Sequence, residues 1–210
     1  MRKRTPKEVS MEITSEIINK VMGEDLVKLG VEEMFFAENI KENRSTVQFE
    51  LKLENQRFNT TEKVAVKGVG SGIVDALYNA VLSNLASKYG SLTEIRFMDF
   101  SITLNPNSSK RLQGTDAKVF VDIAIESLAG GTFHFKSYSR SMVTACMNAV
   151  LESMEYFINC ERCVLLLTDL ITDAKSRERE DLRTMYVNYL SDLVTNTSYV
   201  RTIKEHKNKN

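Results

Sequence analysis

The chain has 210 residues, of which 42% are apolar and 27% are charged, with 28 basic and 28 acidic side chains. These values are typical of a globular protein with a buried core, and they exclude a largely disordered chain. Because the charges balance, composition gives no support for a protein that binds nucleic acid. No apolar run reaches the roughly 20 residues that a membrane span needs, so we expect a cytoplasmic protein with no membrane partner.

The N-terminal segment predicts two helices. Apolar residues recur at helical spacing over residues 6–22, at Val9, Ile13, Ile17 and Val21. A second, shorter helix is predicted over residues 31–39. We therefore interpret residues 1–44 as a helical N-terminal extension.

The following segment predicts two strands, a helix and a third strand. The alternation of apolar residues from Val47 to Leu53 is typical of a half-buried strand, and residues 62–66 are its predicted partner. A glycine turn then leads into a helix over residues 73–88, and a third strand is predicted over residues 95–104. The apolar face of this helix carries Val74, Leu77, Val81 and Leu85.

The chain then repeats itself. Residues 66–85 and 135–154 align without a gap and share a Lys, a Val, an Ala and the run Asn-Ala-Val-Leu. The second copy predicts strands over residues 117–126, 132–138 and 163–170, with a helix over residues 141–157 before the last strand. The predicted fold class is α+β, with a strand-strand-helix-strand unit duplicated over residues 45–172 around a pseudo-two-fold axis.

The C-terminal segment predicts another helix and a basic tail, and we interpret residues 173–210 as a C-terminal extension. The helix carries an apolar stripe that needs a partner surface. Its members are Leu182, Met185, Tyr186, Tyr189, Leu190, Leu193 and Val194. Because such a stripe is too apolar to be exposed to solvent, it favours a homodimer.

Three short segments carry a resemblance to a known family. They are Gly70-Ser71-Gly72-Ile73-Val74-Asp75-Ala76, Phe97-Met98-Asp99-Phe100 and Gly114-Thr115-Asp116-Ala117. Their order and spacing resemble the C-terminal allosteric and dimerisation domain of the alpha-isopropylmalate synthase family, which citramalate synthases share. The resemblance covers roughly residues 45–172 and implies a domain that binds a branched-chain amino acid and homodimerises.

The same resemblance implies that the chain is not an enzyme. The family's catalysis belongs to a separate metal-dependent barrel that condenses acetyl-CoA with a 2-keto acid, and a barrel needs about 250 residues. With His134 and His206 as the only histidines, we expect no metal site, no cofactor and no catalytic group. Cys160 and Cys163 have metal-ligand spacing but no second pair, so we expect ordinary free thiols.

The resemblance also assigns an effector pocket. Its residues are Gly70, Gly72, Val74, Asp75, Phe97, Phe100, Leu104, Ala117, Tyr138 and Ser139. Glycines ahead of a helix let the backbone approach a carboxylate, which the free N–H groups of the helix N-terminus favour. Asp75 is either the counter-charge of the ligand's amine or an acid that stabilises the first helical turn.

The sequence departs from the family pattern at both turns, and the departure at the second turn makes it less able to approach a ligand. Glycines are common in the family where Ser137 and Ser139 stand, and a proline is usual where Ile73 stands. The leading hypothesis is a regulatory domain of leucine and isoleucine biosynthesis that senses leucine or isoleucine. The alternative is an assembly module that dimerises without an effector. Two arrangements stay open: a free-standing protein that acts on a separate synthase catalytic subunit, or part of a longer synthase.

Overall fold

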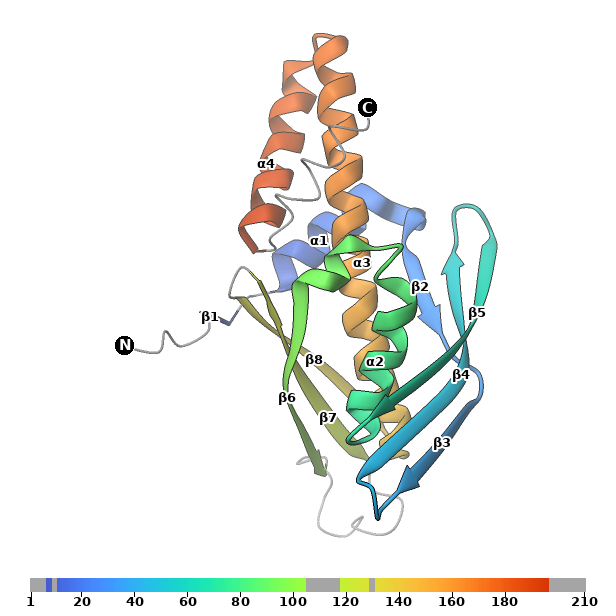
Figure 1. The fold of residues 1–210 in the computed structure, drawn as a ribbon. Helices are drawn as coiled ribbons and strands as arrows, with labels where there is room; N and C mark the ends of the chain where they lie inside the picture. The colour runs from blue at the N-terminus through green and yellow to red at the C-terminus, as the bar shows by residue number, and fades with distance from the viewer. Residues whose placement is uncertain (1–6, 9–10, 105–117, 129–130, 197–210) are drawn as a thin grey trace.

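The computed structural model describes residues 7–8, 11–104, 118–128 and 131–196, which form an α+β fold of two sheets and four α-helices (Figure 1). In the first sheet the long strand β4 (Arg44–Asn55) is central. Strand β5 (Thr60–Gly70) pairs with one edge of β4, while β2 (Val27–Gly30) and β3 (Met34–Asn39) share the other. All of these pairings are antiparallel.

The second sheet contains β6 (Ile95–Leu104), β7 (Val119–Ser127) and β8 (Gly131–Ser139), paired antiparallel in that order. A two-residue strand, β1 (Lys7–Glu8), adds to β8 in parallel. Strand β6 follows the helix α2 (Ile73–Leu85) along the chain but joins the second sheet. Each sheet is therefore a run of antiparallel strands followed by a helix.

The main core lies between the two sheets, where α2 (Ile73–Leu85) and the first half of α3 (Met142–Ser176) pack side by side (Figure 1). The apolar faces predicted for β4 and α2 are confirmed, because every second residue of β4 from Val47 to Leu53 and all four predicted residues of α2 are buried. On α3, Val150 and Met154 are buried with them. Val143 lies at the margin and is half-buried.

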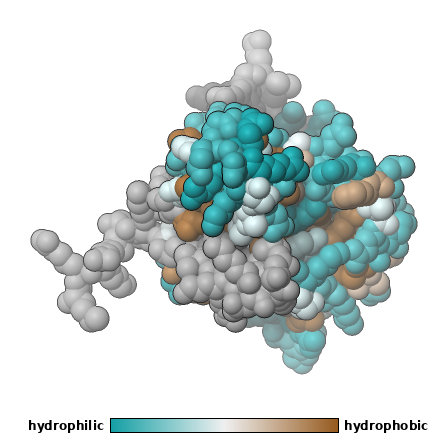
Figure 2. All heavy atoms as spheres, turned by 90° about the horizontal axis from the view of Figure 1, so that it is seen from above, coloured by the Kyte–Doolittle hydropathy of each residue, from teal (hydrophilic) through white to brown (hydrophobic). Residues whose placement is uncertain are grey.

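A second core lies above the first, where α1 (Met11–Met22) and α4 (Glu180–Asn196) pack against the second half of α3. The apolar stripe of α4 thus finds a partner within the chain, with Leu193 fully buried and its other members half-buried. The exposed tip of this helical hairpin, residues 175–181, is hydrophilic (Figure 2). No helix in the described ranges is long and apolar enough to cross a membrane.

Three predicted elements were wrong or misplaced. Residues 34–39 form strand β3 rather than a helix, because pairing with β4 overrides a weak local pattern. Residues 163–170 continue α3 instead of forming a strand: this run is apolar on several faces because α1 and α4 cover it, and periodicity alone does not separate a buried helix from a strand. The N-terminal helix begins at Met11 and exposes Ile13, while Val9 lies outside the described residues.

Polar side chains of α3 hold the outer edge of β2. The Asn159 side chain accepts a hydrogen bond from Val27 N at 2.9 Å and donates one to Val27 O at 2.8 Å. One turn earlier, Glu155 accepts from Leu29 N at 2.6 Å. These side chains replace the neighbouring strand that the edge of β2 lacks, so its buried backbone groups are satisfied.

Helix α3 also binds the two 3-10 helices, η1 (Gly23–Asp25) and η2 (Gly90–Glu94), which contact different faces of it. Arg162 forms an ion pair with Asp25 at 2.8 Å, and Glu161 accepts from Ser91 N at 2.8 Å. Burial alone would raise the pKa of Asp25, but hydrogen bonds from Asn55 and Arg162 outweigh it and lower the pKa below its ordinary value. The ionised carboxylate therefore ties η1 to α3.

Candidate functional site

The connection between β5 and α2 is shaped by close packing. A Cβ on Gly68 would overlap the carbonyl oxygen of Ala76 and the side chain of Ala80, and a Cβ on Gly70 would lie 2.7 Å from Asp75 Oδ2. Both glycines belong to β5 rather than to a free loop. Their lack of a side chain is required by the approach of α2 to the strand, whether or not a ligand binds.

Gly72 differs from these two glycines. It is the residue before α2, with extended backbone (φ −161°, ψ 177°), and a Cβ there would have no atom within 4 Å. Any residue adopts this conformation, so a side chain at Gly72 would cause no backbone strain. The space beside it is open towards the N-terminus of α2.

Asp75 stabilises the first turn of α2. Its Oδ2 accepts from Ser71 N at 2.9 Å and from Ser71 Oγ at 3.3 Å, and its Oδ1 accepts from the Asn79 side chain at 3.1 Å. A carboxylate in this position also favours the positive end of the helix dipole. Of the two roles predicted for Asp75, these contacts support that of the helix-capping acid.

The connection between β8 and α3 uses serines in place of glycines. Ser139 Oγ accepts from Ser141 N at 3.2 Å, and Ser141 Oγ accepts from Thr144 N at 3.3 Å as the N-cap of α3. Tyr138 is 58% exposed, and its ring lies 4.9 Å from that of Phe120 on the face of the sheet that points away from the helices. The structure therefore does not bring Tyr138 together with the other predicted residues.

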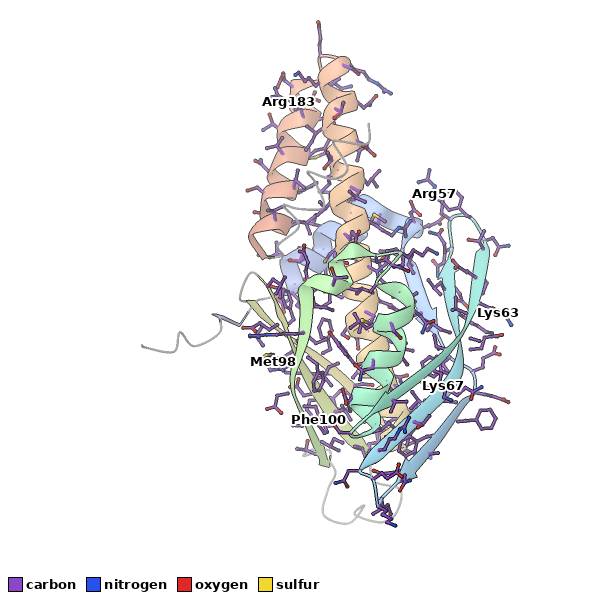
Figure 3. All side chains as sticks on the ribbon, in the orientation of Figure 1. Arg57, Lys63, Lys67, Met98, Phe100 and Arg183 are labelled. Carbon is purple, nitrogen blue, oxygen red and sulfur yellow. The ribbon has the colours of Figure 1, made fainter. Side chains whose placement is uncertain are left out.

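The aromatic residues of β6 lie on the opposite, helix-facing side of the sheet. Phe97 pairs with the buried Ile125, and the centroid of its ring lies 5.8 Å from that of Tyr78. Phe100 is 46% exposed, and the centroid of its ring lies 6.2 Å from that of Phe97 (Figure 3). Burial raises the pKa of Tyr78 to about 12, so this phenol stays neutral. These rings form an apolar wall that is buried at one end and open at the other.

Helices α2 and α3 begin at the same end of the molecule, the end towards which β6 runs (Figure 1). Phe100, Ile102 and Met142 are exposed there. Val74, on the first turn of α2, is buried in the core beneath this surface. Leu104 pairs with Val119 through its backbone, and Ala117 lies outside the described residues. Two helix N-termini beside an apolar surface suit a ligand with a carboxylate and an aliphatic side chain.

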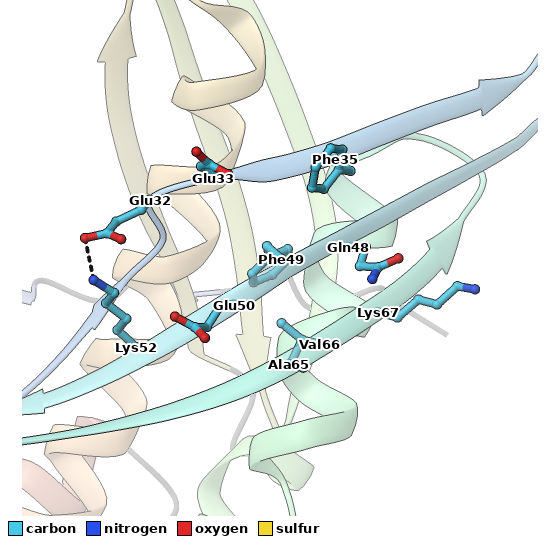
Figure 4. A pocket seen from close by; sticks show the side chains of 10 residues that line it. All are labelled: Glu32, Glu33, Phe35, Gln48, Phe49, Glu50, Lys52, Ala65, Val66 and Lys67. Carbon is cyan, nitrogen blue, oxygen red and sulfur yellow. Dashed lines mark hydrogen bonds and ion pairs between the residues drawn. The ribbon is translucent and has the colours of Figure 1, made fainter.

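A cavity of about 480 Å³ lies elsewhere, on the outer face of the first sheet (Figure 4). It contains none of the predicted site residues. Its lining residues are Glu32, Glu33, Phe35, Gln48, Phe49, Glu50, Lys52, Ala65, Val66 and Lys67. Glu32 and Lys52 form an ion pair at one end of it (Figure 4). Sequence reasoning missed this hollow because it predicted residues 31–39 as a helix, so Glu32, Glu33 and Phe35 were not expected beside β4.

The cysteines lie away from these sites. Cys146, Cys160 and Cys163 are buried free thiols, and burial raises the pKa of Cys163 to about 12. In the described part of the chain, no group of three or more His, Cys, Asp and Glu side chains is placed to hold a metal ion.

A comparison with family models matches residues 8–158 to the LeuA allosteric (dimerisation) domain. No catalytic domain is detected in the chain. A search of curated proteins finds no match. The match spans more than half of the chain and includes both sheets, α2 and the first half of α3. The chain therefore belongs to the family of the LeuA allosteric (dimerisation) domain.

Proposed function

We propose that this protein is a non-catalytic regulatory module of leucine biosynthesis that binds a branched-chain amino acid and acts as a homodimer. The family match carries this proposal. Leucine and isoleucine are the leading effectors, because an aliphatic side chain fits the exposed apolar wall of β6 and a carboxylate fits the N-termini of α2 and α3. A separate synthase catalytic subunit is the expected target of the signal.

We also infer that the two sheets are copies of one unit, and that this unit is three strands followed by a helix. Ser45 pairs with Gly70, and Val119 pairs with Ser139. When these two pairs are aligned, each buried residue of β4 corresponds to a buried residue of β7; Val47, for example, corresponds to Val121. The predicted order of strand-strand-helix-strand fits β4, β5, α2 and β6, but it fails in the second copy because residues 163–170 continue α3 instead of forming a strand.

A shared irregularity supports this inference. In the first sheet, Gly30 pairs with Lys52 and Met34 with Phe49, so residues 31–33 face only two residues of β4. In the second, the same register shift of one residue falls at Met98, between Phe97 and Asp99. A bulge of one residue at equivalent places is a specific feature for two sheets to share by chance.

Calorimetry of the full chain with leucine, isoleucine, valine and the corresponding 2-keto acids tests effector binding. We expect heat of binding for leucine or isoleucine, and at least about tenfold weaker binding for Phe100→Ser, which removes an apolar wall without touching the core. Phe58→Ser is the matched control. Phe58 is 62% exposed in the β4–β5 hairpin of the first sheet. Its neighbour Arg57 lies far from Phe100, which belongs to the second sheet (Figure 3).

The assembly module is the second candidate function. It is favoured by Ser139, which stands where the first copy has Gly70, and by Asp75, whose oxygens are already engaged by Ser71 and Asn79. If no branched-chain amino acid or keto acid binds at millimolar concentrations, effector sensing is wrong and the assembly module takes its place. Equal weakening by Phe58→Ser and Phe100→Ser would place the effector elsewhere.

A further inference from the structure

The cavity on the outer face of the first sheet is built from three neighbouring strands (Figure 4). Phe35 of β3 and Lys67 of β5 lie on either side of Gln48 of β4, because both pair with it. Glu33, which directly precedes β3, lines the same cavity. The volume of about 480 Å³ is in the range of cavities that hold small molecules.

Five charged side chains line this cavity, and two of them lack an opposite charge. Three of the five are neutralised by the ion pairs Glu32–Lys52 and Glu50–Lys63, the second at 2.8 Å. The remaining two are Glu33 and Lys67, both exposed, and neither has an ion-pair partner among the described residues. The cavity therefore offers one free carboxylate and one free ammonium.

The two free charges lie at opposite ends of the cavity. Glu33 belongs to the connection before β3 and Lys67 to β5, so their backbones lie about 10 Å apart across the sheet. Figure 4 shows Phe35 and Gln48 between them. The Phe35 side chain is 74% exposed and gives the middle of the cavity a flat apolar surface.

The second sheet shows what Lys67 lacks. The repeat aligns Lys67 with Lys136, and the strand registers agree, since Lys67 pairs with Gln48 and Lys136 pairs with Asp122. Asp122 Oδ2 lies 3.9 Å from Lys136 Nζ, and its Oδ1 lies 3.0 Å from His134 Nδ1. In the first sheet the neutral Gln48 stands in place of this carboxylate, so the ammonium of Lys67 is available to another anion.

The other end of the cavity shows the same contrast. When β3 and β6 are aligned by their paired residues, Phe35 corresponds to Ser101 and Glu33 to Asp99. Asp99 Oδ1 accepts a hydrogen bond from Phe100 N at 2.8 Å. Glu33 accepts no such bond from the described residues. The second copy thus satisfies its polar groups internally, whereas the first leaves both charges free beside an aromatic ring.

We propose that this cavity binds a small, elongated zwitterion, with an ammonium and a carboxylate at opposite ends of an apolar, flat body. Glu33 binds the ammonium, Lys67 and the Gln48 amide bind the carboxylate, and Phe35 packs against the body. The inference goes beyond effector binding and does not rest on it. An α-amino acid carries both charges on one carbon, so it reaches only one end of this cavity.

Calorimetry of the full chain with para-(aminomethyl)phenylacetate tests the proposal, because this probe carries its two charges at opposite ends of a benzene ring. We expect saturable binding at millimolar concentrations. Its isomer L-phenylalanine, with both charges on one carbon, should bind at least about tenfold more weakly. The same loss is expected for two probes that each lack one charge, para-tolylacetate and para-ethylbenzylamine.

Substitutions locate the site. Lys67→Gln and Glu33→Gln should each weaken binding of para-(aminomethyl)phenylacetate by at least about tenfold, because each removes one of the two charges that hold it. Lys136→Gln is the matched control for the lysine, since Lys136 is exposed at the equivalent position of the second sheet. Glu54→Gln is the control for the glutamate, since Glu54 is exposed on β4 outside the cavity.

Gln48→Asp gives a test by addition. The new carboxylate would pair with Lys67 as Asp122 pairs with Lys136, and it should abolish probe binding although no charged group of the site is removed. The exposed position of Gln48 accepts this change without loss of the fold, which far-ultraviolet circular dichroism verifies.

The outcomes separate this proposal from effector binding. A wild type that shows no saturable binding of the probe overturns it, as does equal weakening by Lys67→Gln and Lys136→Gln. Probe binding that survives Gln48→Asp also overturns it. Leucine calorimetry is independent, because Gln48→Asp should leave leucine binding unchanged and Phe100→Ser should leave probe binding unchanged. Failure of leucine to bind contradicts effector sensing alone.

Discussion

At the scale of single residues, the glycines around α2 have different roles although they alternate regularly in the sequence. Gly68 and Gly70 leave room for the backbone of α2, whereas Gly72 faces open space. The sequence pattern predicted that something approaches this backbone closely. It did not identify the approaching group as the chain's own helix, because that depends on how α2 settles on β5.

Gly68→Val should destabilise the fold, and Gly72→Val should not. The added side chain at Gly68 would overlap Ala76 and Ala80, and overpacking of this kind costs about 3 kcal/mol when the helix must move. At Gly72 the extended backbone accepts valine without strain. Urea denaturation measures both variants, and equal midpoints would contradict the packing role of Gly68.

Calorimetry on Gly72→Val adds a separate readout. Because the substitution fills open space at the N-terminus of α2, it should abolish binding of a branched-chain amino acid while leaving the fold intact. Unchanged affinity would exclude the N-terminus of α2 from the effector site.

At the scale of elements, helix α3 supplies hydrogen bonds that a neighbouring strand would otherwise give to the edge of β2. Asn159 satisfies both the N–H and the C=O of Val27 within the core margin. No sequence pattern predicted this contact, because it joins positions 132 residues apart and depends on the helix continuing beyond its predicted end at residue 157. The strands β4, β5, β6, β7 and β8, by contrast, were predictable because their alternation is local.

Asn159→Ala should lower stability by roughly 1–3 kcal/mol for each backbone group that it leaves buried and unpaired. Asn148→Ala is the control, since Asn148 is exposed on the same helix and its replacement should stay within about 0.5 kcal/mol of the wild type. Chemical denaturation measures both. Similar losses would mean that helix propensity, rather than the β2 contact, determines the effect.

At the scale of the whole molecule, the two cores share α3. The main core between the sheets was predictable from the repeat, because both copies present the same apolar face. The second core was only half predictable: the stripe on α4 was visible, but its partner was expected on another molecule. The second half of α3, which covers this stripe, was not recognised as a helix.

Because α3 is continuous through both cores, we expect them to unfold together in a single calorimetric transition. Leu193→Ala, in the second core, should lower the stability of the whole protein by about 2–5 kcal/mol. Val187→Ala on the same helix is the control, because Val187 is 44% exposed. Two separate transitions, with Leu193→Ala affecting one of them, would show that the cores are independent.

The length of α3 has a mechanical consequence. Its 35 residues form a rod about 50 Å long, which begins beside the proposed effector end and finishes in the hairpin beyond the family match. A rigid rod that pivots at its start by about 5° displaces its far end by about 4 Å, the rise of about three residues of a helix. A change too small to disturb packing around Ser141 is thereby magnified at Ser176.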